Sequence, residues 1–127
     1  MFSPQRITLS NGFGRFIKDY SSIRQEVARS RCEIEQARLL TLAAADKMDK
    51  AGNKAAQDLI AMIKIVAPQM ACDVVDRAIQ IHGGYGLSEE YEVGRLLLEA
   101  KALEFGEGTS ELHRKLIAEF ALGQRKQ

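Results

Sequence analysis

Two long apolar periodicities at helical spacing constrain this chain more than any other feature. Between residues 16 and 50, apolar side chains recur at steps of three, four and seven, which places them on one face of a helix. That face consists of Ile23, Val27, Ile34, Ala37, Leu40, Ala44 and Met48. Gly52 then follows as a helix-ending signal. A helix of about 35 residues would reach about 50 Å, so we expect it to pack against more than its own chain.

The second periodic stretch runs to about His82. Asn53 is a candidate N-cap, because its side chain can accept a hydrogen bond from a free main-chain N–H of the first turn. The apolar face consists of Leu59, Met62, Ile63, Val66, Met70, Val74, Ala78 and Ile81. Pro68 lies within this pattern, and the period continues unshifted after it. We therefore expect a kinked helix rather than two helices.

Glycines divide the rest of the chain into shorter helices. The sequence GGYG, residues 83–86, predicts a firm break because glycine reaches backbone geometries closed to other residues. One helix follows from about Tyr91 to Leu103, and the last begins near Thr109 or Ser110. Their inward-facing residues are predicted to be Val93, Leu96, Leu97 and Ala100, then Leu112, Leu116, Ile117 and Phe120. Two long and two shorter helices favour an all-α fold, an antiparallel four-helix bundle.

Composition bounds the number of domains and the kinds of partner. A chain of 127 residues has the length of one domain, so we expect a single domain over residues 1–127, with residues 1–14 irregular. The net charge of +1 is spread in mixed signs, which favours neither nucleic acid nor an anionic membrane as a partner. No apolar run has the length of a membrane span.

Cysteine and histidine usage bounds the compartment and the metal chemistry. Cys32 and Cys72 form neither a disulfide framework nor a closely spaced metal pair, which favours a reducing compartment such as the cytoplasm or the mitochondrial matrix. His113 has no partner at ligand spacing, so no metal site is expected. Residues 1–18 contain arginine and serine but no acidic residue, a composition that transit peptides share.

Two glycine turns are the candidate functional motifs. In FGEGTSELHR, residues 105–114, Glu107 stands between Gly106 and Gly108 at a predicted helix entrance. The ordinary explanation is a solvated loop. The GGYG turn could cradle a phosphate, because glycines let main-chain N–H groups approach an anion, or it could join two helices without any ligand. Neither motif decides the function when it is taken alone.

In order and at matching gaps, the motifs resemble the C-terminal signature of acyl-CoA dehydrogenases. That signature carries Q-x-x-G-G-x-G, then E-Y and an arginine, then an alanine-containing helix, then E-G-T-S-E and a final arginine. The residues that match it are Gln80, Gly83, Gly84, Gly86, Glu90, Tyr91, Arg95, Ala100, Glu107, Gly108, Thr109, Ser110, Glu111 and Arg114. The upstream stretches FGRFI and RSRCEIEQARLL are also similar to this family. The resemblance covers nearly the whole chain.

The resemblance implies FAD-dependent removal of two hydrogens from the α and β carbons of an acyl-CoA thioester. Glu107 would be the catalytic base for the α proton, and Gly108 would line the acyl-CoA pocket. The main-chain N–H of Glu107 would donate to the thioester oxygen. A carboxylate that loses hydration in a closed site becomes a stronger base, which suits this role.

The resemblance also implies a cofactor, an electron acceptor and an assembly. The adenine end of a neighbouring subunit's FAD is assigned to Gln80, Ile81, His82, Gly83 and Gly84. The FAD of the same subunit is assigned to Thr109, Ser110 and Glu111, and Arg6 is expected to contact FAD phosphates. Electrons would pass to electron-transfer flavoprotein or another acceptor, and the first helix predicts a homodimer or homotetramer.

This chain departs from the family pattern in three ways. Gly106 stands where most members have tyrosine, which should loosen the turn. Arg6 matches the family's FAD-contacting arginine only if residues 9–12, LSNG, are an insertion. Complete members also carry a helical domain and a β domain before this bundle, and we expect both to be absent here. The chain is therefore either a catalytic domain that acts with those domains or a non-catalytic helical oligomerisation module derived from the family.

Overall fold

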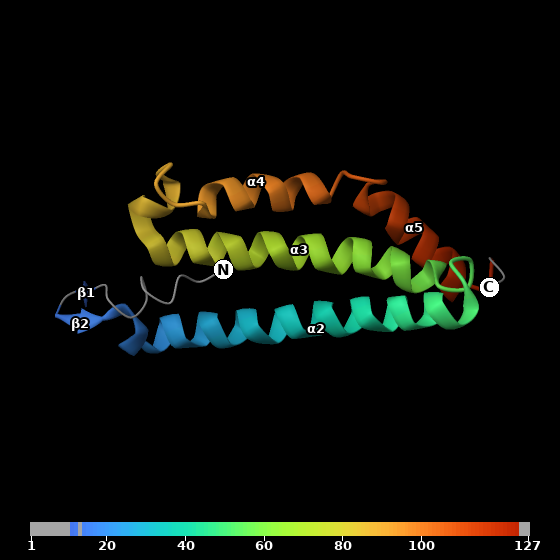
Figure 1. Cartoon of the computed structure of the whole chain (residues 1–127), viewed down its shortest axis with the longest axis horizontal. Coiled ribbons are helices and arrows are strands. Elements are labelled where there is room, and N and C mark those ends of the chain that lie inside the picture. Colours follow the sequence, from blue (N-terminus) through green and yellow to red (C-terminus); the bar gives the residue numbers. More distant parts are fainter. Residues whose placement is uncertain (1–10, 13, 125–127) are drawn as a thin grey trace.

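The computed structural model describes residues 11, 12 and 14–124, and most of this part of the chain is helical (Figure 1). The helices are α2 (Ser21–Ala51), α3 (Gln57–His82), α4 (Val93–Leu103) and α5 (Ser110–Ala121). Helix α3 is central: α2 packs antiparallel against one side of it, and α4 and α5 pack against another. The predicted all-α class with four antiparallel helices is therefore confirmed.

The first helix begins at Ser21, so the prediction of a helix from residue 16 was wrong. Strand β1 (Asn11–Gly12) pairs antiparallel with β2 (Arg15–Phe16), and the 3₁₀ helix η1 (Ile17–Asp19) follows. The main chain is extended at Phe16, with φ −66° and ψ 142°, and again at Tyr20, with φ −78° and ψ 128°. This extended lead-in leaves α2 with 31 residues, or about 46 Å.

Helix α3 begins three residues later than a capping asparagine at position 53 would require. Its N-cap is Ala56, and the main-chain carbonyl of Asn53 accepts a hydrogen bond from the Ala56 N–H at 3.2 Å. Asn53 therefore closes a turn before the helix instead of capping it, and that prediction was wrong. The helix runs through Pro68 without ending, as the unshifted apolar period predicted.

Small side chains let the helices approach one another closely. The buried residues of α2 are Ser30, Ala37 and Ala44, spaced seven apart, which is the seam along which this helix meets α3. On the other side of α3, Val75 and Ala78 form a buried cluster with Val93 of α4. The core is thus thin and lies along both sides of α3.

Several predicted inward-facing residues lie on the surface instead. Met48, Val66 and Leu112 are exposed, together with other large apolar side chains. Because α2 and the α4–α5 pair contact different sides of α3, each helix keeps part of its apolar stripe beyond the contact. No helix in the described part of the chain combines the length and apolar character needed to cross a membrane.

Candidate active site and cofactor surface

The turn from α4 to α5 carries the predicted base. The N–H of Gly106 donates to the Ala102 carbonyl at 3.1 Å and closes the end of α4. The next two residues have positive φ, 58° at Glu107 and 109° at Gly108, so the main chain turns sharply into α5. Glu107 is the one non-glycine residue with positive φ among the residues that the structure describes. It is exposed, and no side chain of the described chain encloses it.

The two glycines that flank Glu107 have different constraints. A Cβ atom at Gly108 would lie 3.2 Å from both the His113 Nε2 and the Leu112 Cδ2, and its φ of 109° also disfavours a side chain. A Cβ atom at Gly106 would meet only the Ala102 carbonyl oxygen, at an ordinary 3.7 Å. The backbone therefore favours glycine at position 108, where a side chain would be strained, whereas position 106 has room for a side chain.

Lys64 of α3 holds this turn from the side. Its Nζ donates to the Gly106 carbonyl at 2.7 Å and lies 3.5 Å from the carbonyl of Leu103, the last residue of α4. Both the N–H and the carbonyl of Gly106 are therefore hydrogen-bonded. These two bonds oppose the loosening that a glycine at this position was expected to cause.

Glu104 anchors the beginning of the same turn. Its carboxylate pairs with the Lys101 Nζ at 2.9 Å and lies 3.5 Å from the Cys72 Sγ of α3. The hydrogen bond from Lys101 lowers the pKa of the Glu104 carboxyl, and burial raises the pKa of the Cys72 thiol. The segment from Glu104 to Gly106 is thus attached to α3 at two places, at the Glu104 carboxylate and at the Gly106 carbonyl.

The three predicted cofactor residues at the start of α5 lie together. Thr109 is the N-cap, with φ −72° and ψ 160°, and Ser110 is the first helical residue. The pKa of the Glu111 carboxyl is lowered by two hydrogen bonds, one from the Glu111 main-chain N–H and one from the Thr109 hydroxyl. Arg114 approaches that carboxylate at 3.3 Å. This helix entrance presents polar groups to solvent immediately after the candidate base.

The second candidate motif lies where α3 ends and the 3₁₀ helix η2 (Gly83–Leu87) begins. Gln80, Gly83 and Gly84 are exposed, whereas Ile81 and His82 are buried. The His82 ring is 2% exposed, its Nδ1 lies 2.7 Å from the Ala78 carbonyl oxygen, and it packs edge-on against a neighbouring tyrosine. Ile81 and His82 therefore offer little exposed surface to a cofactor in this chain.

The glycines of this turn also differ in their constraints. A Cβ atom at Gly86 would lie 2.7 Å from the Ile79 carbonyl oxygen, closer than real Cβ contacts come, so only glycine fits there. At Gly83 and Gly84 a Cβ atom would meet nothing within 4 Å. The buried Gly86 lets the turn fold back onto α3, and the two exposed glycines leave open main chain at its surface.

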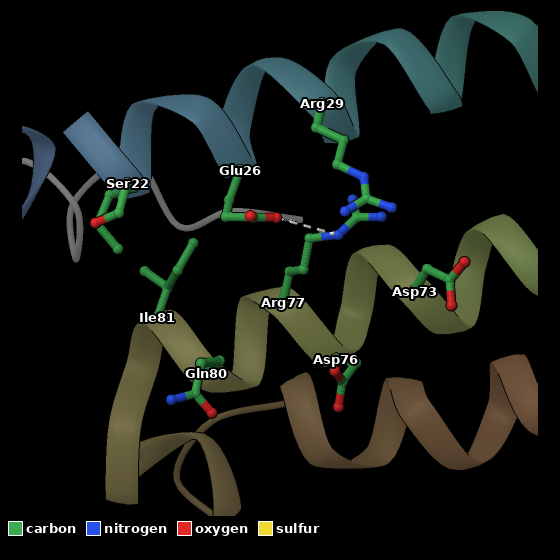
Figure 2. Close-up of a pocket in the computed structure, with 9 residues that line it drawn as sticks. Ser22, Glu26, Arg29, Asp73, Asp76, Arg77, Gln80 and Ile81 are labelled. Carbon is green, nitrogen blue, oxygen red and sulfur yellow. Dashed lines mark ion pairs between the residues drawn. The ribbon is translucent and has the colours of Figure 1, made fainter. Parts of the chain in front are cut away.

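A groove between α2 and α3 borders the Gln80 turn (Figure 2). It has a volume of about 640 Å³ and is lined by Ser22, Ile23, Glu26, Arg29, Asp73, Asp76, Arg77, Gln80 and Ile81. The Arg77 side chain, only 12% exposed, crosses to α2, where it donates to the Ser30 hydroxyl at 2.6 Å and pairs with Glu33. It also lies 3.4 Å from Glu26.

Both arginines of this groove, Arg29 and Arg77, form ion pairs with carboxylates of the same chain. Burial alone would raise the pKa of Glu33, but hydrogen bonds from Arg77 and Arg29 outweigh it and lower the pKa. Each cation therefore has a carboxylate partner, and the exposed amide of Gln80 lies at the edge of the network. The network joins α2 to α3 beside the predicted cofactor turn.

The two candidate motifs are not brought together within one chain. Helix α4 lies between them, and Figure 1 shows the Gln80 turn and the Glu107 turn at its opposite ends. The 11 residues of α4 span about 16 Å. Arg6, the remaining predicted cofactor residue, lies outside the described residues. In the described part of the chain, no three His, Cys, Asp or Glu residues converge on a possible metal position.

Sequence reasoning missed two residues that organise these sites. Lys64 and Gly106 are 42 positions apart, and Arg77 and Glu33 are 44 positions apart. Both lysine and arginine lie in helical stretches where a charged residue ordinarily faces solvent. The charged residues Lys64 and Arg77 within the sequence of α3 hinted at such contacts, but the sequence did not identify their partners.

Comparison with known proteins identifies the family. Residues 5–122 match the family described as "Acyl-CoA dehydrogenase, C-terminal domain". A Mycobacterium tuberculosis protein, "Probable acyl-CoA dehydrogenase FadE2", is 46% identical over 114 residues, which are 90% of this chain and 28% of that protein.

Solved structures share the same arrangement of helices. The structure of butyryl-CoA dehydrogenase from Megasphaera elsdenii matches with a TM-score of 0.86 and 35% identity, over 93% of this chain and 30% of that one. The FAD complex of PigA matches with a TM-score of 0.85 and 26% identity, over 96% of this chain and 31% of that one. This chain spans less than a third of each protein. With a family match over nearly its whole length, the chain belongs to the acyl-CoA dehydrogenase family and corresponds to its C-terminal helical domain.

Proposed function

We propose that this domain supplies the catalytic base and part of the FAD site for α,β-dehydrogenation of an acyl-CoA thioester. The observation that carries the proposal is the backbone at Glu107. A side chain at positive φ costs about 1 kcal/mol or more, and such strain is concentrated at functional sites. A glutamate kept there, exposed between two helices, is explained by a need for its carboxylate.

The residues of the turn have separate tasks in this reaction. The Glu107 carboxylate takes the α proton of the acyl group. The Glu107 main-chain N–H donates to the thioester oxygen, where negative charge develops. Gly108, where a side chain would be strained, leaves room for the acyl group next to the base. Because Glu107 is exposed in this chain, the surface that keeps water away must come from outside the described residues.

The exposed polar groups fit a dinucleotide cofactor. The open main chain of Gly83 and Gly84 and the amide of Gln80 can hydrogen-bond phosphate or adenine edges, and the buried Ile81 and His82 complete the proposed cofactor turn. Thr109, Ser110 and Glu111 provide a second set of polar contacts at the other end of α4. When FAD is bound, it supplies the acceptor for the β-hydrogen as hydride.

The distance between the two turns supports a shared cofactor arrangement. Since the two turns lie at opposite ends of α4, which is about 16 Å long, the Gln80 turn is proposed to serve the FAD of a neighbouring subunit, and the Thr109 turn that of its own. The exposed apolar side chains, among them Leu39, Leu42 and Leu98, support assembly into a homodimer or homotetramer. Electron-transfer flavoprotein is the proposed acceptor for the reducing equivalents.

A domain exchange tests the catalytic role. Residues 5–122 replace the matching segment of the Megasphaera elsdenii butyryl-CoA dehydrogenase, and butyryl-CoA-dependent reduction of bound flavin is followed by absorbance. Glu107→Gln should retain flavin and butyryl-CoA binding but lower the rate by about a thousandfold, because the amide cannot accept the α proton. The control Glu99→Gln alters an exposed ion pair on α4 and should leave the rate unchanged. Equal rates for Glu107→Gln and the parent would remove Glu107 from the reaction.

A non-catalytic oligomerisation module is the second candidate, and the exposed apolar side chains favour it. The exchange separates the two, because an assembly module would give a folded, oligomeric hybrid that never reduces flavin. Light scattering on the 127-residue chain tests the assembly that both candidates share. A monomer at micromolar concentration would contradict it.

A further inference from the structure

The Lys64 contact with the catalytic turn is the strongest feature that the proposed function leaves unexplained. Among the described residues of α3, Lys64 donates to the Gly106–Glu107 peptide: its Nζ lies 2.7 Å from the Gly106 carbonyl oxygen, the shorter of its two hydrogen bonds. The contact with the Leu103 carbonyl, at 3.5 Å, is weaker. The lysine therefore acts on the turn itself more strongly than on the end of α4.

Peptide geometry carries this contact to the neighbouring N–H. The carbonyl of Gly106 and the N–H of Glu107 belong to one peptide unit, and no described peptide bond is cis. In a planar trans peptide the two groups point in opposite directions. Holding the carbonyl oxygen toward Lys64 on α3 therefore directs the Glu107 N–H away from α3.

The charge of Lys64 also changes the strength of that N–H as a donor. A hydrogen bond from an ammonium group is stronger than one between neutral groups, and hydrogen bonds in a chain polarise one another. Electron density drawn toward the Gly106 oxygen leaves the Glu107 N–H more positive. A neutral donor in place of Lys64 would hold the peptide but polarise it less.

We propose that Lys64 is a positioning residue for the dehydrogenation: it orients and polarises the Gly106–Glu107 peptide, so that the Glu107 N–H stabilises the negative charge that develops on the thioester oxygen. This inference rests on the proposed function of the Glu107 turn. It assigns to α3, 42 residues before Gly106 in the chain, a part in the reaction that no residue of the turn itself can supply.

A purely structural role is the alternative, because a cation at the end of α4 also complements the helix dipole. Lys101 offers the matched control: it is a cation in the last turn of the same helix, and it pairs with the Glu104 carboxylate instead of the Gly106 carbonyl. Loss of either cation removes charge from the helix end, but only loss of Lys64 releases the peptide.

The first measurement uses the 127-residue chain and nuclear magnetic resonance. Lys64→Met should move the Gly106 ¹³C′ and Glu107 ¹⁵N resonances upfield together, since both nuclei lose the polarising hydrogen bond. Lys101→Met leaves the Lys64 hydrogen bond to the Gly106 carbonyl in place and should move both resonances far less. Unmoved resonances in Lys64→Met would overturn the inference whatever the activity proves to be.

The second measurement uses the domain exchange with butyryl-CoA dehydrogenase. Lys64→Met should lower kcat about tenfold with KM unchanged, because the contact acts on the transition state, and Lys64→Arg should recover most of the rate. Glu107→Gln in the same hybrid keeps the two proposals apart. If Glu107→Gln is inactive while Lys64→Met equals the parent, only the Lys64 inference fails; if Glu107→Gln stays active, the proposed function fails. A rise in KM with resonance changes throughout α4 and α5 would reduce Lys64 to a structural role.

Discussion

Two turns of this molecule each place a residue at nearly the same positive φ, but that residue is a glycine in one turn and a glutamate in the other. Gly83 has φ 61° at the end of α3, and Glu107 has φ 58° at the end of α4. Glycine takes this geometry at little cost, whereas glutamate pays a steric penalty of about 1 kcal/mol. The first turn follows what the backbone prefers, and the second keeps a carboxylate against that preference.

The two turns also differ in how they are held. The Gln80 turn is packed from within: His82 is buried, Gly86 lies against the main chain of α3, and Arg77 joins the helices beside it. The Glu107 turn is exposed and is held from one side by Lys64. The comparison indicates that the first turn contributes mostly to folding and the second mostly to chemistry.

The largest effect is expected at Gly86. Gly86→Ala should lower the free energy of unfolding by about 3 kcal/mol, because its Cβ would lie 2.7 Å from a main-chain oxygen that cannot move freely. Gly84→Ala and Gly106→Ala, whose Cβ atoms have room, should change it by less than about 0.5 kcal/mol. Urea unfolding of the three variants measures the difference. A neutral Gly86→Ala would mean that the Gln80 turn is not tightly packed.

The next effect is expected at Arg77. Arg77→Met should destabilise the chain by about 2 kcal/mol, because the buried Ser30 hydroxyl and the half-buried Glu33 carboxylate lose their donor. Arg29→Met removes an exposed partner of the same carboxylate and should cost less. Thermal unfolding of both variants gives the order. Equal losses would contradict a special role for the cross-helix contact.

Substitutions at Glu107 and Gly83, which both have positive φ, should change the free energy of unfolding in opposite directions. Glu107→Gly should raise the free energy of unfolding by about 1 kcal/mol by removing steric strain, whereas Gly83→Ala should lower it by about 1 to 2 kcal/mol by introducing strain. Chemical denaturation of the two single variants measures both changes. Destabilisation by Glu107→Gly would show that the glutamate supports the fold, and the contrast between the turns would fail.

The smallest effect is a pH dependence from Glu33. Its pKa in the folded chain lies below the ordinary value of 4.5, so the folded state binds the proton less readily than the unfolded state. The stabilisation is complete above that ordinary value and is lost as the pH falls through the lower folded-state pKa. Urea unfolding between pH 6 and pH 3 should show this loss, and a smaller one in Arg77→Met. The same slope in both proteins would exclude the Arg77 contact as its source.

Local signals predicted some helix boundaries and missed others. The break after His82 was read from the glycines of GGYG, whose effect is local, and the start of α5 was expected near Thr109 or Ser110, where the structure has it. The start of α2 was misread because apolar spacing near residue 16 does not distinguish a helix from an extended lead-in. Asn53 was wrongly predicted as a helix N-cap because asparagine is equally common in turns, and here it closes the turn before α3.

The helical class, the family and the two glycine motifs could be predicted from the order of the amino acids, because periodicity and motif spacing are properties of neighbouring residues. Tertiary structure alone decided that His82 is buried, that Gly86 but not Gly84 requires glycine, and that Glu107 has strained backbone. It alone paired Lys64 with Gly106 and Arg77 with Glu33, across more than 40 positions. Such pairs depend on how two helices are rotated and shifted against each other, and that register is set by packing of the whole core rather than by any local pattern.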